Sequence, residues 1–87
     1  MAVWVDDMRI AKHGQLWCHL VADTWEEMHG FALSTLHLDG KRFHRRAKLP
    51  HYDVTVTERE QALLLGAQAA NRRQIVLCAR QLLLLQH

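Results

Sequence analysis

Three helix-capping patterns divide this 87-residue chain, and the segments before and between the predicted helices have room only for short strands. The first pattern is at Asp23 or Thr24, each with a glutamate three residues later, and the second is at Thr55 or Thr57 with the same spacing. Asn71 repeats the pattern with a glutamine. In such a capping box two side chains bond each other's backbone N–H groups, which makes it a specific signal for a helix start. The chain is therefore predicted to contain three helices.

Short β-rich runs occupy the segments before the first two helices. Val3–Val5 and Gln15–Val21 each indicate a strand, and residues 51–56 indicate a third strand or extended segment. The first helix is expected to end at Asp39–Gly40. This order of elements predicts a single α+β domain over residues 1–87, in which three helices cover one face of a small sheet of about three short strands.

The composition excludes several classes of protein. Apolar residues make up 49% of the chain and charged residues 23%, which is ordinary for a globular domain and unlike a disordered or collagen-like chain. Apolar runs such as Leu82–Leu85 are far shorter than the roughly 20 residues that span a bilayer. The first residues lack the basic region and apolar core of a secretory signal. Cys18 and Cys78 lie in apolar stretches without a zinc-binding spacing, so we expect a cytoplasmic protein with two buried thiols and no disulfide.

Charge is divided unequally between the two halves of the chain. Residues 1–40 contain two basic and six acidic residues, whereas residues 41–87 contain nine basic and three acidic ones. Five of the ten residues from Lys41 to Pro50 are basic, with Phe43 among them, and this basic loop is expected to be exposed. Cations bind phosphates and an aromatic ring stacks on a base, so the basic loop favours an anionic partner. The alternative is that the basic half packs against the acidic half of the same domain.

Two acidic residues follow the first predicted strand. Because successive side chains of a strand point to opposite faces, only one of Asp6 and Asp7 can face a given pocket. A carboxylate at a strand end can bind a metal or act as a general base. The alternative is that it caps a turn by accepting hydrogen bonds from nearby backbone N–H groups.

Two of the seven histidines are candidates for a functional site. His19 lies inside an apolar strand, and His51 is separated from Asp53 by a single residue. In an extended segment, residues two positions apart face the same way, so the imidazole of His51 and the carboxylate of Asp53 are expected to lie together. Such a pair can bind a metal, or the carboxylate can orient the imidazole for proton transfer. The alternative is a structural histidine whose hydrogen bonds are satisfied within the fold.

Several motifs together resemble those of a small uncharacterised domain family found in bacteria and their phages. The motifs are Val5-Asp6-Asp7, His19-Leu20-x-Ala22-Asp23 and Pro50-His51-Tyr52-Asp53. The resemblance extends from Val3 to about Gln74 and implies no particular activity. It implies a shared site, because polar residues of this kind are poor core residues. The residues that define the match are Asp6, Asp7, His19, Asp23, His51, Tyr52 and Asp53.

These observations predict a domain that binds a phosphate-bearing ligand, such as a nucleotide or nucleic acid, at a His/Asp site beside the basic loop. The candidate catalytic residues are Asp6, Asp7, His19, His51 and Asp53. The candidate ligand-binding residues are Arg42, Arg45, Arg46, Lys48 and Tyr52. A divalent metal ion is the one cofactor that these residues suggest, and Asp6, His19, His51 and Asp53 would either bind it or transfer a proton. Whether the ligand is hydrolysed stays open at this point.

A second interpretation is a non-enzymatic interaction module of phage origin that contacts a protein partner or DNA. Four consecutive leucines, Leu82–Leu85, cannot all face one side of a helix, so some of them are expected to be exposed or buried in a homodimer. A helix-turn-helix over Glu60–Leu82 is disfavoured, because Arg72 occupies a position where that motif needs a core residue.

Overall fold

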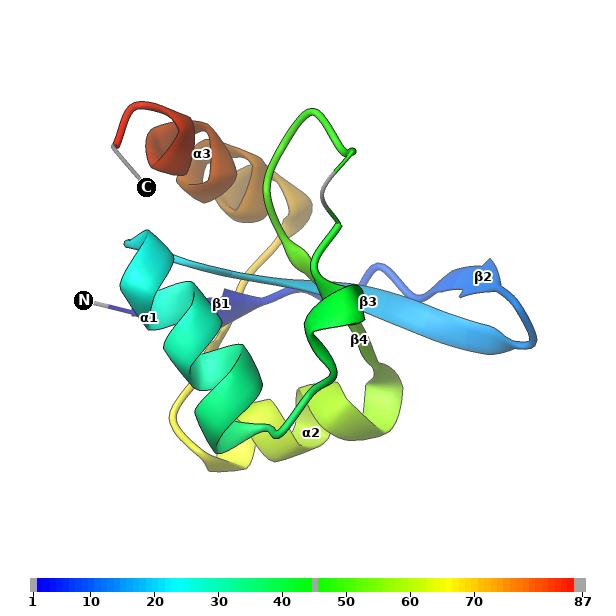
Figure 1. Ribbon diagram of the computed structural model, residues 1–87. Coiled ribbons are helices and arrows are strands. Elements are labelled where there is room, and N and C mark those ends of the chain that lie inside the picture. Colours follow the sequence, from blue (N-terminus) through cyan, green and yellow to red (C-terminus); the bar gives the residue numbers. More distant parts are fainter. Residues whose placement is uncertain (1, 45, 86–87) are drawn as a thin grey trace.

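A computed structural model describes residues 2–44 and 46–85 and confirms the α+β class (Figure 1). The strands are β1 (Val3–Val5), β2 (Ile10–Lys12), β3 (Gln15–Ala22), β4 (Tyr52–Thr55) and β5 (Gln68–Ala69). The helices are α1 (Trp25–Gly30), α2 (Val56–Leu64) and α3 (Arg72–Leu83), and a π-helical turn (Phe31–Thr35) and a 3-10 turn (Gly40–Arg42) follow α1. Within the described ranges, none of the helices has the length and apolar character needed to cross a membrane.

The central strand of the sheet is β3, which pairs along both of its edges. β1 and β2 follow one another along one edge, each antiparallel to β3, and β4 is antiparallel along the other edge. β5 extends the sheet beyond β1, to which it is parallel. The prediction of about three strands was too low, because the sheet has five. β2 and β5 are only three and two residues long and exposed, so the sequence shows no burial pattern that would mark them as strands.

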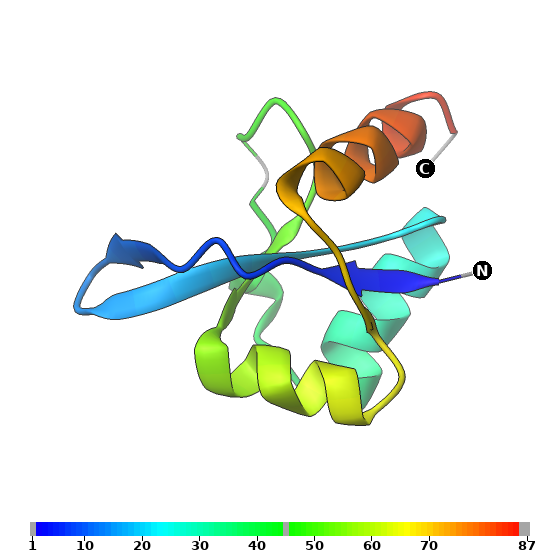
Figure 2. The same ribbon diagram turned by 180° about the vertical axis from the view of Figure 1, so that it is seen from behind.

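Apolar side chains form a core on each face of the sheet. The larger core lies between the sheet and helices α1 and α2, and it includes the fully buried side chains of Leu20 and Val54. The smaller core consists of Val21, Ile75 and Ala79, the last two of which belong to α3. α3 lies on the opposite side of the sheet from α1 and α2 (Figure 2). The prediction that all helices cover one face was therefore wrong. Because Val21 is apolar as well, the second face of β3 also needs cover, and the apolar stripe of α3 provides it.

The helix starts confirm the capping patterns and select between their alternatives. The hydroxyl of Thr24 accepts the N–H of Glu27 at 3.1 Å. Thr55 forms a complete capping box with Glu58, and Asn71 begins α3 with another whose glutamine partner lies three residues later. In each helix the side chain of the capping residue accepts a backbone N–H of the first turn that would otherwise be unpaired. This hydrogen bond determines the residue at which the helix begins.

The first helix ends earlier than the predicted Asp39–Gly40. Its last turn widens into the π-helix and ends at Leu36, after which His37 adopts a positive φ of 56°. Asp39 instead accepts the N–H of Lys41 at 2.9 Å and caps the following 3-10 turn. The predicted stop of α2 at Gly66 is confirmed by its φ of 113°, which favours glycine.

Both cysteines are free thiols, as the sequence predicted. Cys18 is buried in the larger core, and burial raises the pKa of its thiol. Cys78 is half-buried and its Sγ donates to the carbonyl of Ala22 at 3.2 Å. Burial, together with the carboxylates of Asp23 and Glu27, raises the pKa of Cys78 to about 12. Neither thiol is therefore an activated nucleophile.

Candidate functional site

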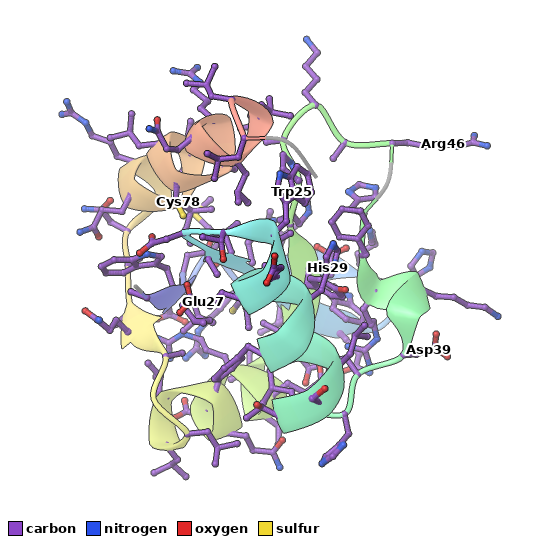
Figure 3. The ribbon with its side chains drawn as sticks, turned by 60° about the vertical axis from the view of Figure 1, so that its left-hand side comes forward. Trp25, Glu27, His29, Asp39, Arg46 and Cys78 are labelled. Atoms are coloured by element: carbon purple, nitrogen blue, oxygen red, sulfur yellow. The ribbon has the colours of Figure 1, made fainter. Side chains whose placement is uncertain are left out.

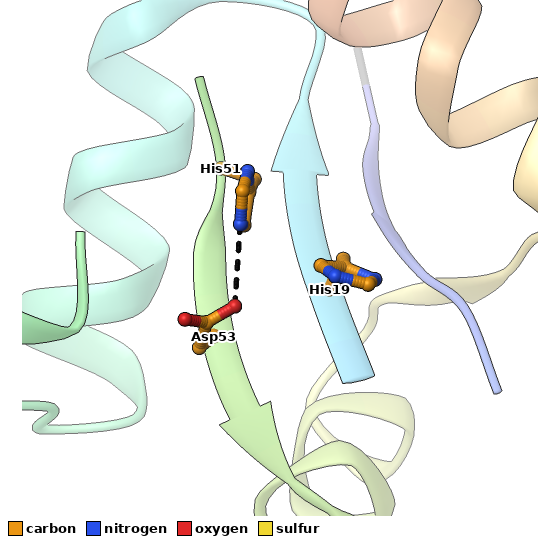
Figure 4. Close-up of side chains that lie close together, drawn as sticks. All are labelled: His19, His51 and Asp53. Atoms are coloured by element: carbon orange, nitrogen blue, oxygen red, sulfur yellow. Dashed lines mark ion pairs between the residues drawn. The ribbon is translucent and has the colours of Figure 1, made fainter. Parts of the chain in front are cut away.

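Two imidazoles and a carboxylate meet on the face of the sheet that α3 covers in part (Figure 4). His19 on β3 and Asp53 on β4 are direct cross-strand partners, and His51 lies just before β4 on the same side. One ligand atom from each of the three residues lies within 4.8 Å of the others. The rings of His19 and His51 meet edge to face with their centroids 5.0 Å apart. The strand alternation that placed His51 beside Asp53 in the sequence also explains why all three side chains share this face.

The buried carboxylate of Asp6 fixes the orientation of the His19 ring. The side chain of Asp6 is almost fully buried, with 1% of the residue exposed. One carboxylate oxygen lies 2.7 Å from Nδ1 of His19, and the other accepts the backbone N–H groups of His19 at 2.9 Å and Met8 at 3.3 Å. Because a carboxylate accepts, Nδ1 of His19 carries the proton in this bond. The Nε2 atom of the same ring is thereby left as the ligand or base.

The backbone orients His51 in a similar way. Its Nδ1 donates to the carbonyl oxygen of Leu49 at 2.9 Å, and its Nε2 lies 3.2 Å from the carboxylate of Asp53. Burial alone would lower the pKa of His51, but the hydrogen bonds to Asp53 and Leu49 outweigh it and raise the pKa. Burial would raise the pKa of Asp53, but the hydrogen bond and charge of His51 lower it. The two groups therefore favour each other's charged forms.

Two hollows adjoin the histidine pair, and His19 and His51 line both of them. The larger has a volume of about 490 Å³ and lies between the sheet, α3 and residues 47–49 of the basic loop. Lys48 and Arg72 are the cations on its lining. The smaller hollow, of about 290 Å³, extends toward β2 and is lined by Lys12 and Asp53. The three side chains thus lie where two recesses with basic residues meet.

Two candidate residues from the sequence lie away from this site. Asp7 points outward with 52% of its side chain exposed, and its carboxylate accepts from Arg9 at 2.6 Å. This confirms that only one of the paired aspartates faces inward, since Asp6 is the buried one. Tyr52 lies on the opposite face of β4, buried in the larger core, with its hydroxyl 2.7 Å from Nδ1 of His29. It therefore lines neither hollow.

The cations of the basic loop do not act as one patch. The guanidinium of Arg42 lies 2.6 Å from the carboxylate of Glu58 and 5.1 Å from the centre of the Trp17 ring, so it joins the loop to α2 and β3. Arg46 extends away from the rest of the fold (Figure 3). Among the described cations of the basic loop, Lys48 alone borders one of these two hollows. Arg45 lies outside the described residues.

The site also includes residues that the sequence had not marked. Lys12, Arg72 and His44 are not among the residues that the sequence predicts for the site, and His44 lies within the basic loop that is expected to be exposed. His44 is indeed exposed, but its N–H donates to the carbonyl of His51 at 3.0 Å and its ring centroid lies 5.1 Å from that of His51. The signal for His44 was the extended run around Phe43, which forms a bridge to Tyr52 and continues the sheet pairing.

The donor set of this site suits particular ions. Two imidazole nitrogens and one carboxylate oxygen are ligands that zinc and other divalent transition metals take, and three protein ligands leave positions for water or substrate. The same three groups can also transfer a proton, since imidazole changes its charge near neutral pH. Both chemistries require the side chains that the fold brings together here.

Comparison with known proteins identifies a family whose model matches this sequence. No match was found among curated proteins, and none among solved structures. The sequence-based expectation of a family of unknown function is confirmed, since the family model described as "Protein of unknown function (DUF4031)" matches residues 3–82. This match spans nearly the whole chain, and the chain therefore belongs to that family.

Proposed function

We propose that this chain binds a divalent transition-metal ion through His19, His51 and Asp53, and that a phosphate-bearing ligand binds beside it. One observation carries the proposal: both Nδ1 atoms are committed to other acceptors. The Nδ1 of His19 bonds to Asp6 and the Nδ1 of His51 bonds to the Leu49 carbonyl. The Nε2 atoms are therefore the ones left to bind an ion beside the Asp53 carboxylate, and the ion would displace the proton through which Nε2 of His51 contacts that carboxylate at 3.2 Å. Histidine ligands are commonly supported in this way by acceptors behind them.

The identity of the ion follows from its donors. Imidazole suits zinc, iron, nickel and copper, whereas magnesium and calcium prefer oxygen ligands alone. With two nitrogens among the three donors, we expect zinc to bind more tightly than manganese, and magnesium to bind weakly. The expected stoichiometry is one ion per chain, because His19, His51 and Asp53 are the one group of this kind within the described residues.

The charge around the site supports an anionic ligand. Lys12 faces the smaller hollow, and Lys48 and Arg72 face the larger one. Cations on both sides of a metal ion would stabilise the several negative oxygens of a phosphate group. A neutral ligand would leave these positive charges without a partner in the complex.

Hydrolysis of a phosphate ester is the reaction that this arrangement favours. A three-ligand ion retains a position for water or a phosphate oxygen. In the reaction, the oxygen of a water molecule bonds to phosphorus while the water gives up one proton, the bond from phosphorus to the ester oxygen breaks, and the leaving alcohol takes up a proton from solvent. We assign the acceptance of the water's proton to His44, which lines the smaller hollow.

The proposal is tested first by metal binding. Metal-stripped protein is titrated with Zn²⁺ and Mn²⁺ by calorimetry, and the His51→Ala and Asp53→Ala variants are titrated in parallel. We expect one high-affinity Zn²⁺ site that both substitutions weaken by at least about tenfold. Turnover of a chromogenic phosphodiester by the loaded protein then tests the reaction.

Two controls make the metal experiment decisive. His13→Asn removes an exposed imidazole at a positive φ of 51°, which asparagine tolerates, and Asp7→Asn removes the exposed carboxylate of the same aspartate pair. Both variants should bind Zn²⁺ like the unmodified protein. Absence of a high-affinity site, or equal loss in the control variants, contradicts the proposal.

A second function is favoured by a separate observation on α3. Leu82 is fully buried, but Leu83 is 54%, Leu84 78% and Leu85 43% exposed. We propose that these three leucines form a contact with a second copy of the chain. Sedimentation equilibrium tests this: a monomer at all concentrations, unchanged by Leu83→Glu and Leu85→Glu, would contradict a homodimer.

A further inference from the structure

The larger hollow has mostly apolar walls. α3 supplies one wall, in which Val76 is half-buried and Ile75 and Ala79 are almost fully buried. The opposite side and the end toward the basic loop are apolar as well. Besides these three residues, the apolar lining includes Met8, Ile10 and Leu49. Such walls suit the organic part of a ligand and not a phosphate alone.

Apart from the cations Lys48 and Arg72, the polar groups of this hollow lie at one place. Asp6, His19 and His51 are adjacent to one another, because Asp6 bonds to His19 and the two rings are in contact. A phosphate bound at His19 and His51 would leave the apolar walls to the group that the phosphate carries. A ligand with a charged end and an apolar or aromatic body would therefore be complementary to this lining.

The size of the hollow limits the length of the ligand. A volume of about 490 Å³ lies within the range of pockets that hold one small organic molecule, roughly 300–1,000 Å³. A nucleic-acid strand needs instead a row of cations that follows its backbone. The described cations of the basic loop do not form such a row, since Arg42 pairs with Glu58 and Arg46 extends away from the fold.

We propose, resting on the function proposed above, that the natural ligand is a small phosphate ester with an apolar or aromatic body, about the size of a single nucleotide. The phosphate binds where the two hollows meet at His19 and His51, and the organic body occupies the larger hollow against Val76. A nucleic-acid polymer is thereby disfavoured as the ligand.

Binding to the Zn²⁺-loaded protein tests this inference. Adenosine 5′-monophosphate, phenyl phosphate, inorganic phosphate, adenosine and a ten-nucleotide oligothymidylate are compared by calorimetry. We expect at least one of the two esters to bind about tenfold or more tightly than inorganic phosphate, since it buries apolar surface as well. Adenosine should bind weakly, and the oligonucleotide should bind no more tightly than the better ester.

A variant that fills the larger hollow provides the matched comparison. Val76→Trp places a large side chain on the lining, whereas Leu77→Trp adds the same group at the next residue, which is 53% exposed and lines neither hollow. We expect Val76→Trp to lose the advantage of the ester over inorganic phosphate while it retains Zn²⁺ affinity, which also shows that it is folded. Leu77→Trp should retain both.

The outcomes separate this inference from the proposed function. If Zn²⁺ and inorganic phosphate bind but neither ester binds more tightly than phosphate, the inference is wrong and the metal–phosphate site stands. If the oligonucleotide binds most tightly and Val76→Trp does not weaken it, the inference is wrong and a polymer is the ligand. If Zn²⁺ does not bind at all, the proposed function itself fails.

Discussion

The carboxylate of Asp6 lies 2.7 Å from Nδ1 of His19. Asp6 directly follows β1, and His19 lies in the neighbouring strand β3. Asp6 is 1% exposed, and its second oxygen accepts two backbone N–H groups. A buried carboxylate with all of these partners has a fixed position. The orientation of the His19 ring is therefore set by a residue that is not itself one of the three proposed metal ligands.

Asp6→Asn should weaken metal binding without removing a ligand. An asparagine can present its NH₂ group or its oxygen to Nδ1, so it no longer enforces the tautomer that leaves Nε2 as a ligand. We expect Zn²⁺ affinity to fall by about 10- to 100-fold, as found for partners behind histidine ligands. Calorimetric titration measures this. The neighbouring Asp7→Asn substitution is the control, and an equal effect of the two would refute the positioning role.

Glu58 should stabilise the fold only above acidic pH. Burial would raise the pKa of Glu58, but the hydrogen bonds from Arg42 and from the Thr55 N–H outweigh it and lower the pKa. A carboxyl whose pKa is lower in the folded state contributes stability above its unfolded pKa of about 4.3, and this contribution is lost as the pH falls through the folded value. Glu58→Gln should therefore cost about 1 kcal/mol at pH 7 and less at pH 3.

Urea unfolding of Glu58→Gln and the unmodified protein at both pH values provides the measurement. Glu60→Gln is the matched control, because the side chain of Glu60 is 60% exposed. Its effect should be small at either pH. A cost for Glu58→Gln that is the same at pH 3 and pH 7 would show that the carboxylate charge is not what matters.

Substitutions within Leu82–Leu85 should differ strongly in their effect on the free energy of unfolding. Leu82 is fully buried, and the Nε1–H of Trp25 donates to its carbonyl at 2.9 Å. We expect Leu82→Ala to lower the free energy of unfolding by about 2–5 kcal/mol, the usual range for a core leucine. Leu83→Ala, at the next position, should change it by less than about 0.5 kcal/mol in the monomer. Chemical denaturation at low protein concentration compares the two.

The thiols should react slowly with alkylating reagents in the folded protein. The thiolate is the reactive form, and a pKa of about 12 for Cys78 leaves little of it at pH 8. Cys18 is fully buried, and this burial also raises the pKa of its thiol. We expect both cysteines to be modified rapidly only in denaturant. Mass spectrometry after a timed reaction with iodoacetamide distinguishes the residues, and fast labelling of native Cys78 would be the contrary result.

Local patterns in the sequence predicted much of the fold because they act over three or four residues. The capping boxes at Thr55 and Asn71 are examples, and so is the common face of His51 and Asp53, which depends only on strand alternation. The partnership of His19 with Asp53 could not be predicted in this way. It depends on the register between β3 and β4, which is set by packing of the whole sheet.

Charged residues were the least predictable part of the site. Lys12 and Arg72 lie at positions where neither periodicity nor capping distinguishes a lining residue from a solvated one. Conversely, Arg42 belonged to the strongest cationic run in the sequence but pairs with Glu58. Whether a cation faces a ligand or a carboxylate depends on tertiary contacts between segments that are distant in the chain.

The cross-strand pairing of His19 with Asp53 has a consequence for the order in which the molecule matures. The two residues are far apart along the chain, so a newly synthesised polypeptide does not bring the three proposed ligands together until β3 and β4 have paired. Loading of the proposed ion would then follow folding, and a bound ion would slow the separation of β3 and β4. The lifetime of the folded protein would in that case report the supply of metal in its surroundings.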